Sequence, residues 1–191
     1  MAVRDILIDC EPLLNEPGFA FLAPEAAGDA WYPNRFTEPV ATNEPWLSSA
    51  LETVDGLLER LAPSIPPERV VLLGFSQGAC LALEYAARRA RRYGAVVGLS
   101  GALIGPPDAP RGIRGSLQGT PVFLGCGDVD PYISSDLVQA AGDHLRRLEG
   151  EVNVQVYPGM AHVVSADEIA QVRRLMAALT RRDRLERPAR S

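Results

Sequence analysis

The sequence predicts an α/β protein built on a mostly parallel, doubly wound sheet. Apolar runs typical of buried strands alternate with amphipathic helical patterns along most of the chain. The runs at 70–73, 95–99 and 121–125 are apolar at almost every position, as in parallel strands that helices cover on both faces. In such a sheet, reactive groups gather at the carboxyl ends of the strands.

Strand patterns recur five times. They lie in the segments 19–23, 70–73, 95–99, 121–125 and 152–157. The last of these alternates apolar and polar residues, which is typical of a half-buried strand.

Four helical patterns fill the intervals. Asn43 is a suitable N-cap for leucines at helical spacing in 47–61. Gly94 and Gly150 are expected to end helices that begin near residues 77 and 135. Ser165 and Glu168 have the spacing of a capping box, which predicts a last helix running to about residue 180.

Length and composition limit the number of domains and the kinds of partner. The chain has 191 residues, 47% of them hydrophobic, which suffices for one well-buried core. We therefore predict one domain over 1–180 and a flexible, Arg-rich tail over 181–191. The formal charge of -5 and the lack of a basic stripe argue against a nucleic-acid partner.

Cysteine spacing and the N-terminal composition point to a reducing compartment. Cys10, Cys80 and Cys126 have no metal-ligand spacing, so we expect free thiols and no metal. We see neither a signal-peptide core nor an apolar run of membrane-spanning length, and expect a cytoplasmic protein without an integral membrane segment. All 19 basic residues are Arg, which suggests a GC-rich, bacterial coding sequence.

The strongest functional signal is Gly74-Phe75-Ser76-Gln77-Gly78, directly after the strand pattern 70–73. A Gly-x-Ser-x-Gly turn between strand and helix is typical of a nucleophile elbow, which lifts the serine hydroxyl clear of the backbone. The five-residue pattern is weak by itself, and the preceding strand and following small residues give it weight. We expect Gly74 and Gly78 because side chains there would collide with neighbouring elements.

A serine nucleophile needs a base and an acceptor that orients the base. Of the two histidines, His162 follows a strand pattern on a loop, whereas His144 lies mid-helix and is expected to be solvated or partly packed. Two aspartates follow the fourth strand pattern, and we favour Asp130 because Asp128 suits a turn-forming role. The order Ser76, Asp130, His162 is that of α/β hydrolases.

At this point the residues resemble the phospholipase/carboxylesterase family of α/β hydrolases, which includes bacterial carboxylesterases, acyl-protein thioesterases and lysophospholipases. The resemblance covers about residues 19–180. Four ordered motifs carry it: Gly-Phe-Ser-Gln-Gly-Ala at 74–79, Leu-Ser-Gly at 99–101, Gly-Asp-x-Asp-Pro at 127–131 and Gly-Met-x-His at 159–162.

The resemblance implies a serine carboxylic-ester hydrolase that needs no cofactor. Its triad would be Ser76, Asp130 and His162, with the backbone N–H of Gln77 as an oxyanion donor. Small acyl esters are the expected substrates, with lysophospholipids and thioesters as further candidates. The candidate pocket residues, each also compatible with plain packing, are Trp31, Tyr32, Trp46, Phe75, Tyr132 and Ile133.

Family members also begin with an apolar strand that ends in a His-Gly turn, which supplies a second oxyanion donor. This sequence lacks that segment, and 1–14 has the pattern of the helix that should follow it. We expect a slot between 19–23 and 70–73, and favour a start assigned too late or a truncated chain over a genuinely short protein. The alternative function is a weakly active or inactive homologue that only binds a ligand or partner.

Overall fold

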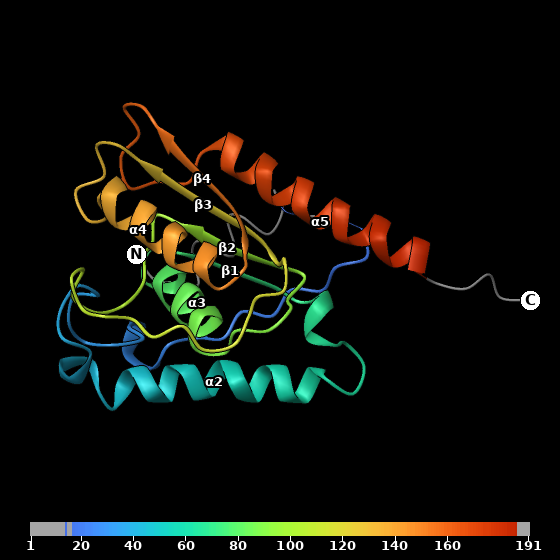
Figure 1. Ribbon diagram of the computed structural model, residues 1–191, viewed down its shortest axis with the longest axis horizontal. Coiled ribbons are helices and arrows are strands. Elements are labelled where there is room, and N and C mark those ends of the chain that lie inside the picture. The colour runs from blue at the N-terminus through green and yellow to red at the C-terminus, as the bar shows by residue number, and fades with distance from the viewer. Residues whose placement is uncertain (1–13, 15–16, 187–191) are drawn as a thin grey trace, which may run out of the picture.

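The computed structural model describes residue 14 and residues 17–186, with side chains described as far as residue 181. It contains a four-stranded, all-parallel sheet in the order β1-β2-β3-β4 (Figure 1). The strands are β1 (Val71–Phe75), β2 (Ala95–Leu99), β3 (Pro121–Gly127) and β4 (Glu151–Tyr157). Four of the five predicted strands are therefore confirmed. The helix predicted over 1–14 lies outside the described residues, apart from Leu14.

Helices cover both faces of this sheet, as a doubly wound fold requires (Figure 1). A larger buried cluster joins one face to α2, α3 and α4, and a smaller one joins the other face to α5. The α-helices are α2 (Trp46–Leu61), α3 (Gln77–Arg88), α4 (Ser135–Arg147) and α5 (Ala166–Glu186). Short 3-10 helices span Ala27–Asp29, Val40–Asn43 and Pro67–Arg69.

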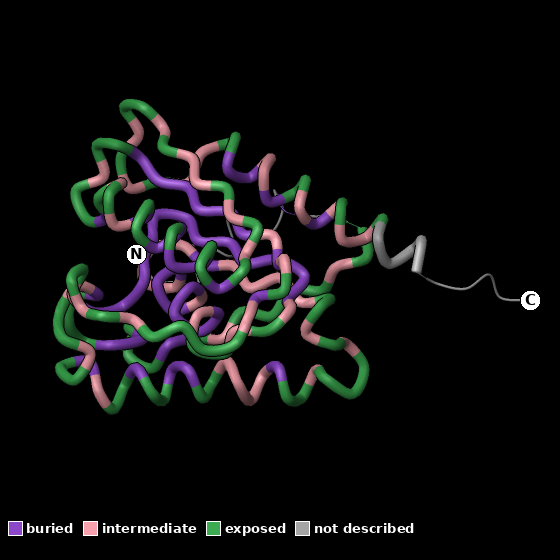
Figure 2. Tube along the Cα trace, viewed as in Figure 1, coloured by how far each residue is buried: buried purple, intermediate pink, exposed green. Residues whose placement is uncertain are grey.

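Burial differs sharply among the strands (Figure 2). Every residue of β2 is buried, and β3 is buried except at Pro121. Four of the five residues of β1 are only half-buried, although its sequence is that of a central strand. β1 is therefore an edge strand of the described sheet.

The strand predicted over 19–23 is wrong for this structure. None of the residues 17–26 is in a strand, and residues 17–22 line a cavity whose other wall includes β1. A strand needs a neighbour to satisfy its N–H and C=O groups. Among the described residues, no strand pairs with this segment.

The predicted start of α2 and the predicted end of α4 also need correction. Asn43 is buried and caps no helix: its Oδ1 accepts the N–H of Asn34 at 2.9 Å, and α2 begins at Trp46. The α4 helix ends at Arg147, and Glu149 rather than Gly150 adopts the left-handed conformation, with φ 63°. The N–H of Gly150 bonds to the carbonyl of Leu145 at 2.9 Å, which completes a Schellman-type ending.

Gly94 does not cap α3, which ends at Arg88. It instead lies where backbones approach closely: a Cβ there would be 2.9 Å from the carbonyl oxygen of Val70 and 2.7 Å from Leu179. Close packing between the start of β1 and α5, not helix termination, therefore explains this glycine.

The capping box at the start of α5 is confirmed. The Ser165 N–H donates to Glu168 Oε2 at 2.7 Å, and the Glu168 N–H donates to Ser165 Oγ at 3.2 Å. The helix continues to Glu186, beyond its predicted end near residue 180. The division into a domain over 1–180 and a tail stays a prediction. No helix in the described part of the chain is long and apolar enough to cross a membrane.

The capping box predicts a measurable difference between two serines at helix starts. Ser165→Ala should lower the free energy of unfolding by about 0.5–2 kcal/mol, because it removes the cap hydroxyl. Ser134→Ala at the start of α4 is the matched control, since the Ser134 side chain makes no cap hydrogen bond. Urea denaturation of both variants measures this, and equal losses would contradict the assignment.

Candidate active site

Ser76 lies on a sharp turn between β1 and α3. Its backbone has φ 53° and ψ -123°, a strained conformation for a residue with a side chain. Its N–H donates to the carbonyl of Leu99 at 2.9 Å, which continues the β1-β2 ladder through the turn. This geometry is typical of a nucleophile elbow.

The two glycines of the elbow have different roles. A Cβ on Gly74 would lie 2.2 Å from the carbonyl oxygen of Gly78, so no larger residue fits. A Cβ on Gly78 would meet no atom of the described residues within 4 Å. The predicted collision is therefore correct for Gly74, whereas the described residues contain no group that would collide at Gly78.

Backbone hydrogen bonds to the neighbouring strand also hold the residues that follow β2 and β3. The Ser100 N–H donates to the carbonyl of Gly125 at 2.7 Å, and the Asp128 N–H donates to the carbonyl of Tyr157 at 3.2 Å. Ser100 is also left-handed, with φ 47°. These bonds hold the turns after β1, β2 and β3 at one edge of the sheet.

His162 meets Ser76 and Asp130 at that edge. Its Nε2 is 2.8 Å from Ser76 Oγ, and its Nδ1 is 2.7 Å from Asp130 Oδ2. The three side chains come from three separate connections, after β1, β3 and β4. The rings of Phe75 and Tyr132 contact the imidazole, with centroids 4.8 and 5.0 Å away, and so restrict its orientation.

The Asp130 carboxylate is fully buried and held at both oxygens. Oδ2 faces His162, while Oδ1 accepts the N–H groups of Tyr132 at 2.8 Å and Ile133 at 3.1 Å. Burial raises the pKa of Asp130, but the hydrogen bonds from His162, Tyr132 and Ile133 outweigh it and hold the pKa below its ordinary value. Asp130 is thus an ionised acceptor.

The two residues that the sequence offered as alternatives, Asp128 and His144, make other contacts. Asp128 Oδ1 accepts the N–H of Gly159 at 2.6 Å, and this bond ties the β3 loop to the β4 loop. His144 is packed in α4 with 3% of its surface exposed, and its Nδ1 lies 3.3 Å from Arg147. Burial, followed by the charges of Arg111 and Arg147, lowers its pKa.

Gln77 has a side-chain role that the sequence did not reveal. Its Oε1 accepts the N–H of Trp31 at 2.8 Å, and its Nε2 donates to the carbonyl of Tyr32 at 2.9 Å. The residue after the serine therefore anchors a loop 45 residues earlier. No local pattern marks such a contact, although a long amide at the start of a buried helix suggests a partner. Its backbone N–H lies at the start of α3, where the helix dipole favours negative charge.

The six predicted pocket residues occupy different surroundings. Trp31 and Phe75 line a cavity of about 720 Å³ beside β1. Tyr32 is buried next to Trp31, and Ile133 is buried in the core. Tyr132 and Trp46 are 64% and 53% exposed, and Tyr132 alone of these two contacts His162. The structure thus brings Phe75 and Tyr132 directly to the candidate site.

The described residues provide neither a metal-ligand cluster nor an ionised thiol. Within residues 14 and 17–186, no group of three His, Cys, Asp or Glu side chains is arranged to hold a metal ion. Cys80 and Cys126 are free and buried, and burial raises the pKa of each to about 11. Both thiols therefore stay protonated at neutral pH.

Comparison with known proteins agrees with the motifs. The phospholipase/carboxylesterase family model matches residues 23–180. The chain belongs to this family. A crystal structure of a phospholipase/carboxylesterase from Dyadobacter fermentans is 38% identical, with a TM-score of 0.85 over 93% of this chain and 85% of that one.

The proteins that the chain resembles in sequence include fungal thioesterases. Acyl-protein thioesterase 1 of Debaryomyces hansenii is 32% identical over 123 residues, which is 62% of this chain and 53% of that protein. Acyl-protein thioesterase 1 of Saccharomyces cerevisiae is 34% identical over 125 residues, or 64% and 54%. The chain thus spans about half the length of the curated relatives it matches.

The elbow predicts opposite effects for its two glycines. Gly74→Ala should destabilise the protein by about 3 kcal/mol or more, because the new methyl group overlaps the Gly78 carbonyl. Gly78→Ala should be neutral or stabilise by up to about 1 kcal/mol, since alanine favours helix and no described residue would contact the new methyl group. Denaturant titration of the pair checks this, and equal destabilisation would be inconsistent with the turn.

The lowered pKa of Asp130 predicts a pH-dependent contribution to stability. Because the folded pKa lies below the unfolded value, the contribution is complete above about pH 5 and is lost as the pH falls through the folded pKa. The difference in the free energy of unfolding between wild type and Asp130→Asn should therefore become smaller below about pH 4. Urea titrations from pH 7 to 3 measure it, and a gap that widens with acid would contradict it.

Proposed function

We propose that this protein is a serine carboxylic-ester hydrolase with Ser76, His162 and Asp130 as its triad. The observation that carries the proposal is the continuous hydrogen-bonded chain from the Ser76 hydroxyl through the imidazole to a buried carboxylate. Membership of the phospholipase/carboxylesterase family supports the same reaction class.

The proposed chemistry follows from the protonation states that this chain favours. Ionised Asp130 can only accept, so Nδ1 of His162 carries a proton and Nε2 is free to act as the base. Nε2 takes the hydroxyl proton as Ser76 Oγ attacks the acyl carbonyl, then passes that proton to the leaving alcohol or thiol. Water activated by the same nitrogen then hydrolyses the acyl-enzyme.

The Gln77 N–H is the oxyanion donor that we assign. It lies one residue beyond the nucleophile at the start of α3, which is the position that receives the oxyanion in an elbow. Removal of one donor typically costs about 10²–10³ in turnover. A site that depended on this donor alone would turn over slowly. Slow turnover favours a second candidate function, that of a homologue that binds a ligand with little hydrolysis.

For the substrate we propose small acyl esters, with lysophospholipids and thioesters as further candidates. The name of the two fungal relatives, acyl-protein thioesterase 1, supports a thioester, and the family description supports carboxylic and phospholipid esters. Serine attack on an acyl carbonyl is common to all three. No cofactor is needed for this chemistry. A bacterial, cytoplasmic setting remains a prediction.

Hydrolysis of a short p-nitrophenyl ester tests the triad. Ser76→Ala and His162→Ala should each lower kcat by roughly 10⁴-fold or to background, because each removes a group that acts in the transition state. Ser49→Ala, on the exposed face of α2, is the matched control and should retain the wild-type rate. Full activity in both triad variants would refute the assignment.

A fluorophosphonate probe separates the two candidate functions. Covalent labelling of wild type and Ser49→Ala, absent in Ser76→Ala, is expected of a hydrolase because the probe requires an activated serine. Ester binding without labelling of the wild type would instead support the binding-only homologue.

A further inference from the structure

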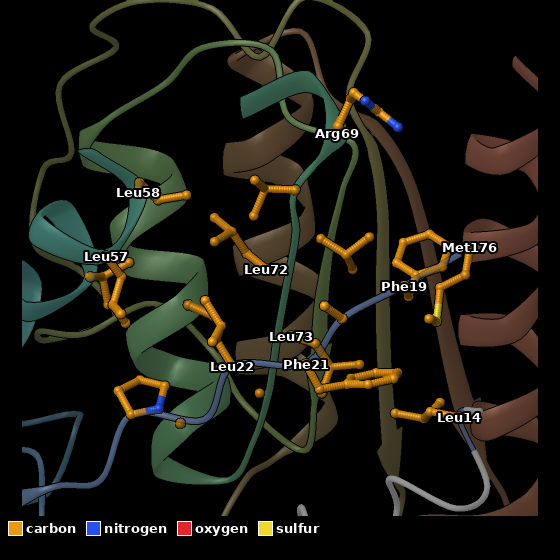
Figure 3. A pocket seen from close by; sticks show the side chains of 18 of the residues that line it. Leu14, Phe19, Phe21, Leu22, Leu57, Leu58, Arg69, Leu72, Leu73 and Met176 are labelled. Atoms are coloured by element: carbon orange, nitrogen blue, oxygen red, sulfur yellow. The ribbon is translucent and has the colours of Figure 1, made fainter. Parts of the chain in front are cut away.

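Two aromatic rings flank the imidazole of His162, and they belong to different surfaces. Phe75 is half-buried and lines the apolar cavity beside β1, together with side chains such as Leu73 and Met176 (Figure 3). Tyr132 is 64% exposed and is not among the described residues that line this cavity. Of the two rings, Tyr132 is therefore the one whose surface is open beside the imidazole.

The backbone around Tyr132 is fixed, which holds the ring in place. The Tyr132 N–H donates to Asp130 Oδ1 at 2.8 Å, and the N–H of Ile133, a buried residue, donates to the same oxygen at 3.1 Å. Pro131 precedes the tyrosine and restricts the backbone there. The ring centroid lies 5.0 Å from that of His162, at an interplanar angle of 69°. The tyrosine ring and the imidazole thus meet edge to face.

The two loops that carry the aspartate and the histidine of the candidate triad expose further apolar side chains. Val129 precedes Asp130 and is 58% exposed, and Val163 follows His162 and is 53% exposed. The Val129 N–H donates to the carbonyl of Met160 at 3.3 Å, so the two loops are joined at this point. Isolated exposed apolar residues are common, but these valines and the tyrosine flank one reactive group, as expected of a binding surface.

The charges of these two loops, residues 128–134 and 158–165, disfavour an anionic leaving group. Neither loop contains Arg or Lys. Apart from His162, their titratable side chains are Asp128, which is exposed, and Asp130. Carboxylates would repel a phosphate group placed here, and no cation from these loops would offset the repulsion. The loops therefore favour an uncharged group.

The proposed reaction brings the alcohol part of the ester to this surface. Nε2 of His162 lies 2.8 Å from Ser76 Oγ, and it must also reach the alcohol oxygen. That oxygen takes the proton from Nε2 as its bond to the acyl carbon breaks. The carbon attached to the alcohol oxygen consequently lies next to the imidazole, where Tyr132 presents the more exposed of the two rings.

We infer that Tyr132 determines the leaving-group specificity of this site, and that its ring receives the uncharged, apolar alcohol part of an ester in preference to a glycerophosphate part. The inference rests on the proposed function, and it narrows the substrate class to esters of aromatic and alkyl alcohols. An aromatic alcohol should gain most, because two rings form an aromatic pair in addition to excluding water.

Three butyrate esters with the same acyl group test this specificity: benzyl butyrate, methyl butyrate and butyryl glycerophosphocholine. Wild type should hydrolyse the benzyl ester with the highest kcat/KM and the glycerophosphocholine ester with the lowest. Tyr132→Ala should lower the ratio of benzyl to methyl kcat/KM by about fivefold or more, because it removes the aromatic pair. Tyr132→Phe should preserve the ratio, since the ring remains. Ile113→Ala is the matched control, because Ile113 is 48% exposed on the connection after β2, which carries no triad residue.

A merely structural role for Tyr132 would give a different result. If the ring only oriented the imidazole, its loss would slow the benzyl and methyl esters by the same factor. An equal loss for both esters, or an unchanged ratio in Tyr132→Ala, would therefore overturn the inference and leave the triad assignment intact.

A binding measurement separates failure of this inference from failure of the proposed function. Ser76→Ala cannot form an acyl-enzyme, so titration of this variant with benzyl alcohol, the product, reports binding alone. Benzyl alcohol should shift the NMR signals of the His162 ring, glycerophosphocholine should not, and adding Tyr132→Ala should abolish the shifts. No shift with benzyl alcohol, or equal shifts with both compounds, would overturn the inference whether or not the protein hydrolyses esters. Shifts with benzyl alcohol but no hydrolysis by wild type would support the apolar subsite and refute the proposed function.

Discussion

The contact between the end of β1 and the first turn of α3 sets the geometry of the candidate active site. The chain reverses so tightly that the Gly74 Cα lies against the carbonyl of Gly78, where not even a methyl group fits. Ser76 is thereby held in a strained backbone conformation with its hydroxyl directed to His162. The rung from Ser76 to Leu99 and the buried start of α3 stabilise the strained turn.

The loops that bring His162 and Asp130 to this turn are held by backbone bonds between strand ends. Ser100 is bonded to the end of β3, and Asp128 links the β3 loop to both Tyr157 and Gly159. Asp130 can therefore use one oxygen for two backbone N–H groups and the other for His162. The orientation of the imidazole depends on the register of the parallel sheet as much as on the three side chains themselves.

The sheet also contains a conflict between sequence and position. β1 has the composition of a strand buried on both faces, yet it lines an apolar cavity and is an edge strand of the described sheet. The segment 17–24 passes nearby without forming a ladder with it. Edge strands in stable proteins are commonly covered by another element or protected by charged residues. Within the described residues, neither kind of protection is present at the outer edge of β1.

By itself, the sequence determined the four strands, the sheet type, the helical intervals and the capping box, and it singled out Ser76, Asp130 and His162 as the candidate triad. These features depend on local periodicity, on short turn motifs and on the rule that parallel strands end at one edge. Only the tertiary structure decided the rest. It showed that 19–23 forms no strand and that Asn43 binds a loop instead of capping a helix. It also showed that Gly74 is confined whereas no described residue crowds Gly78, and that the Gln77 side chain binds the backbone of Trp31 and Tyr32. Each of these depends on which residue from elsewhere in the chain occupies the adjacent space, and local sequence carries no record of that neighbour.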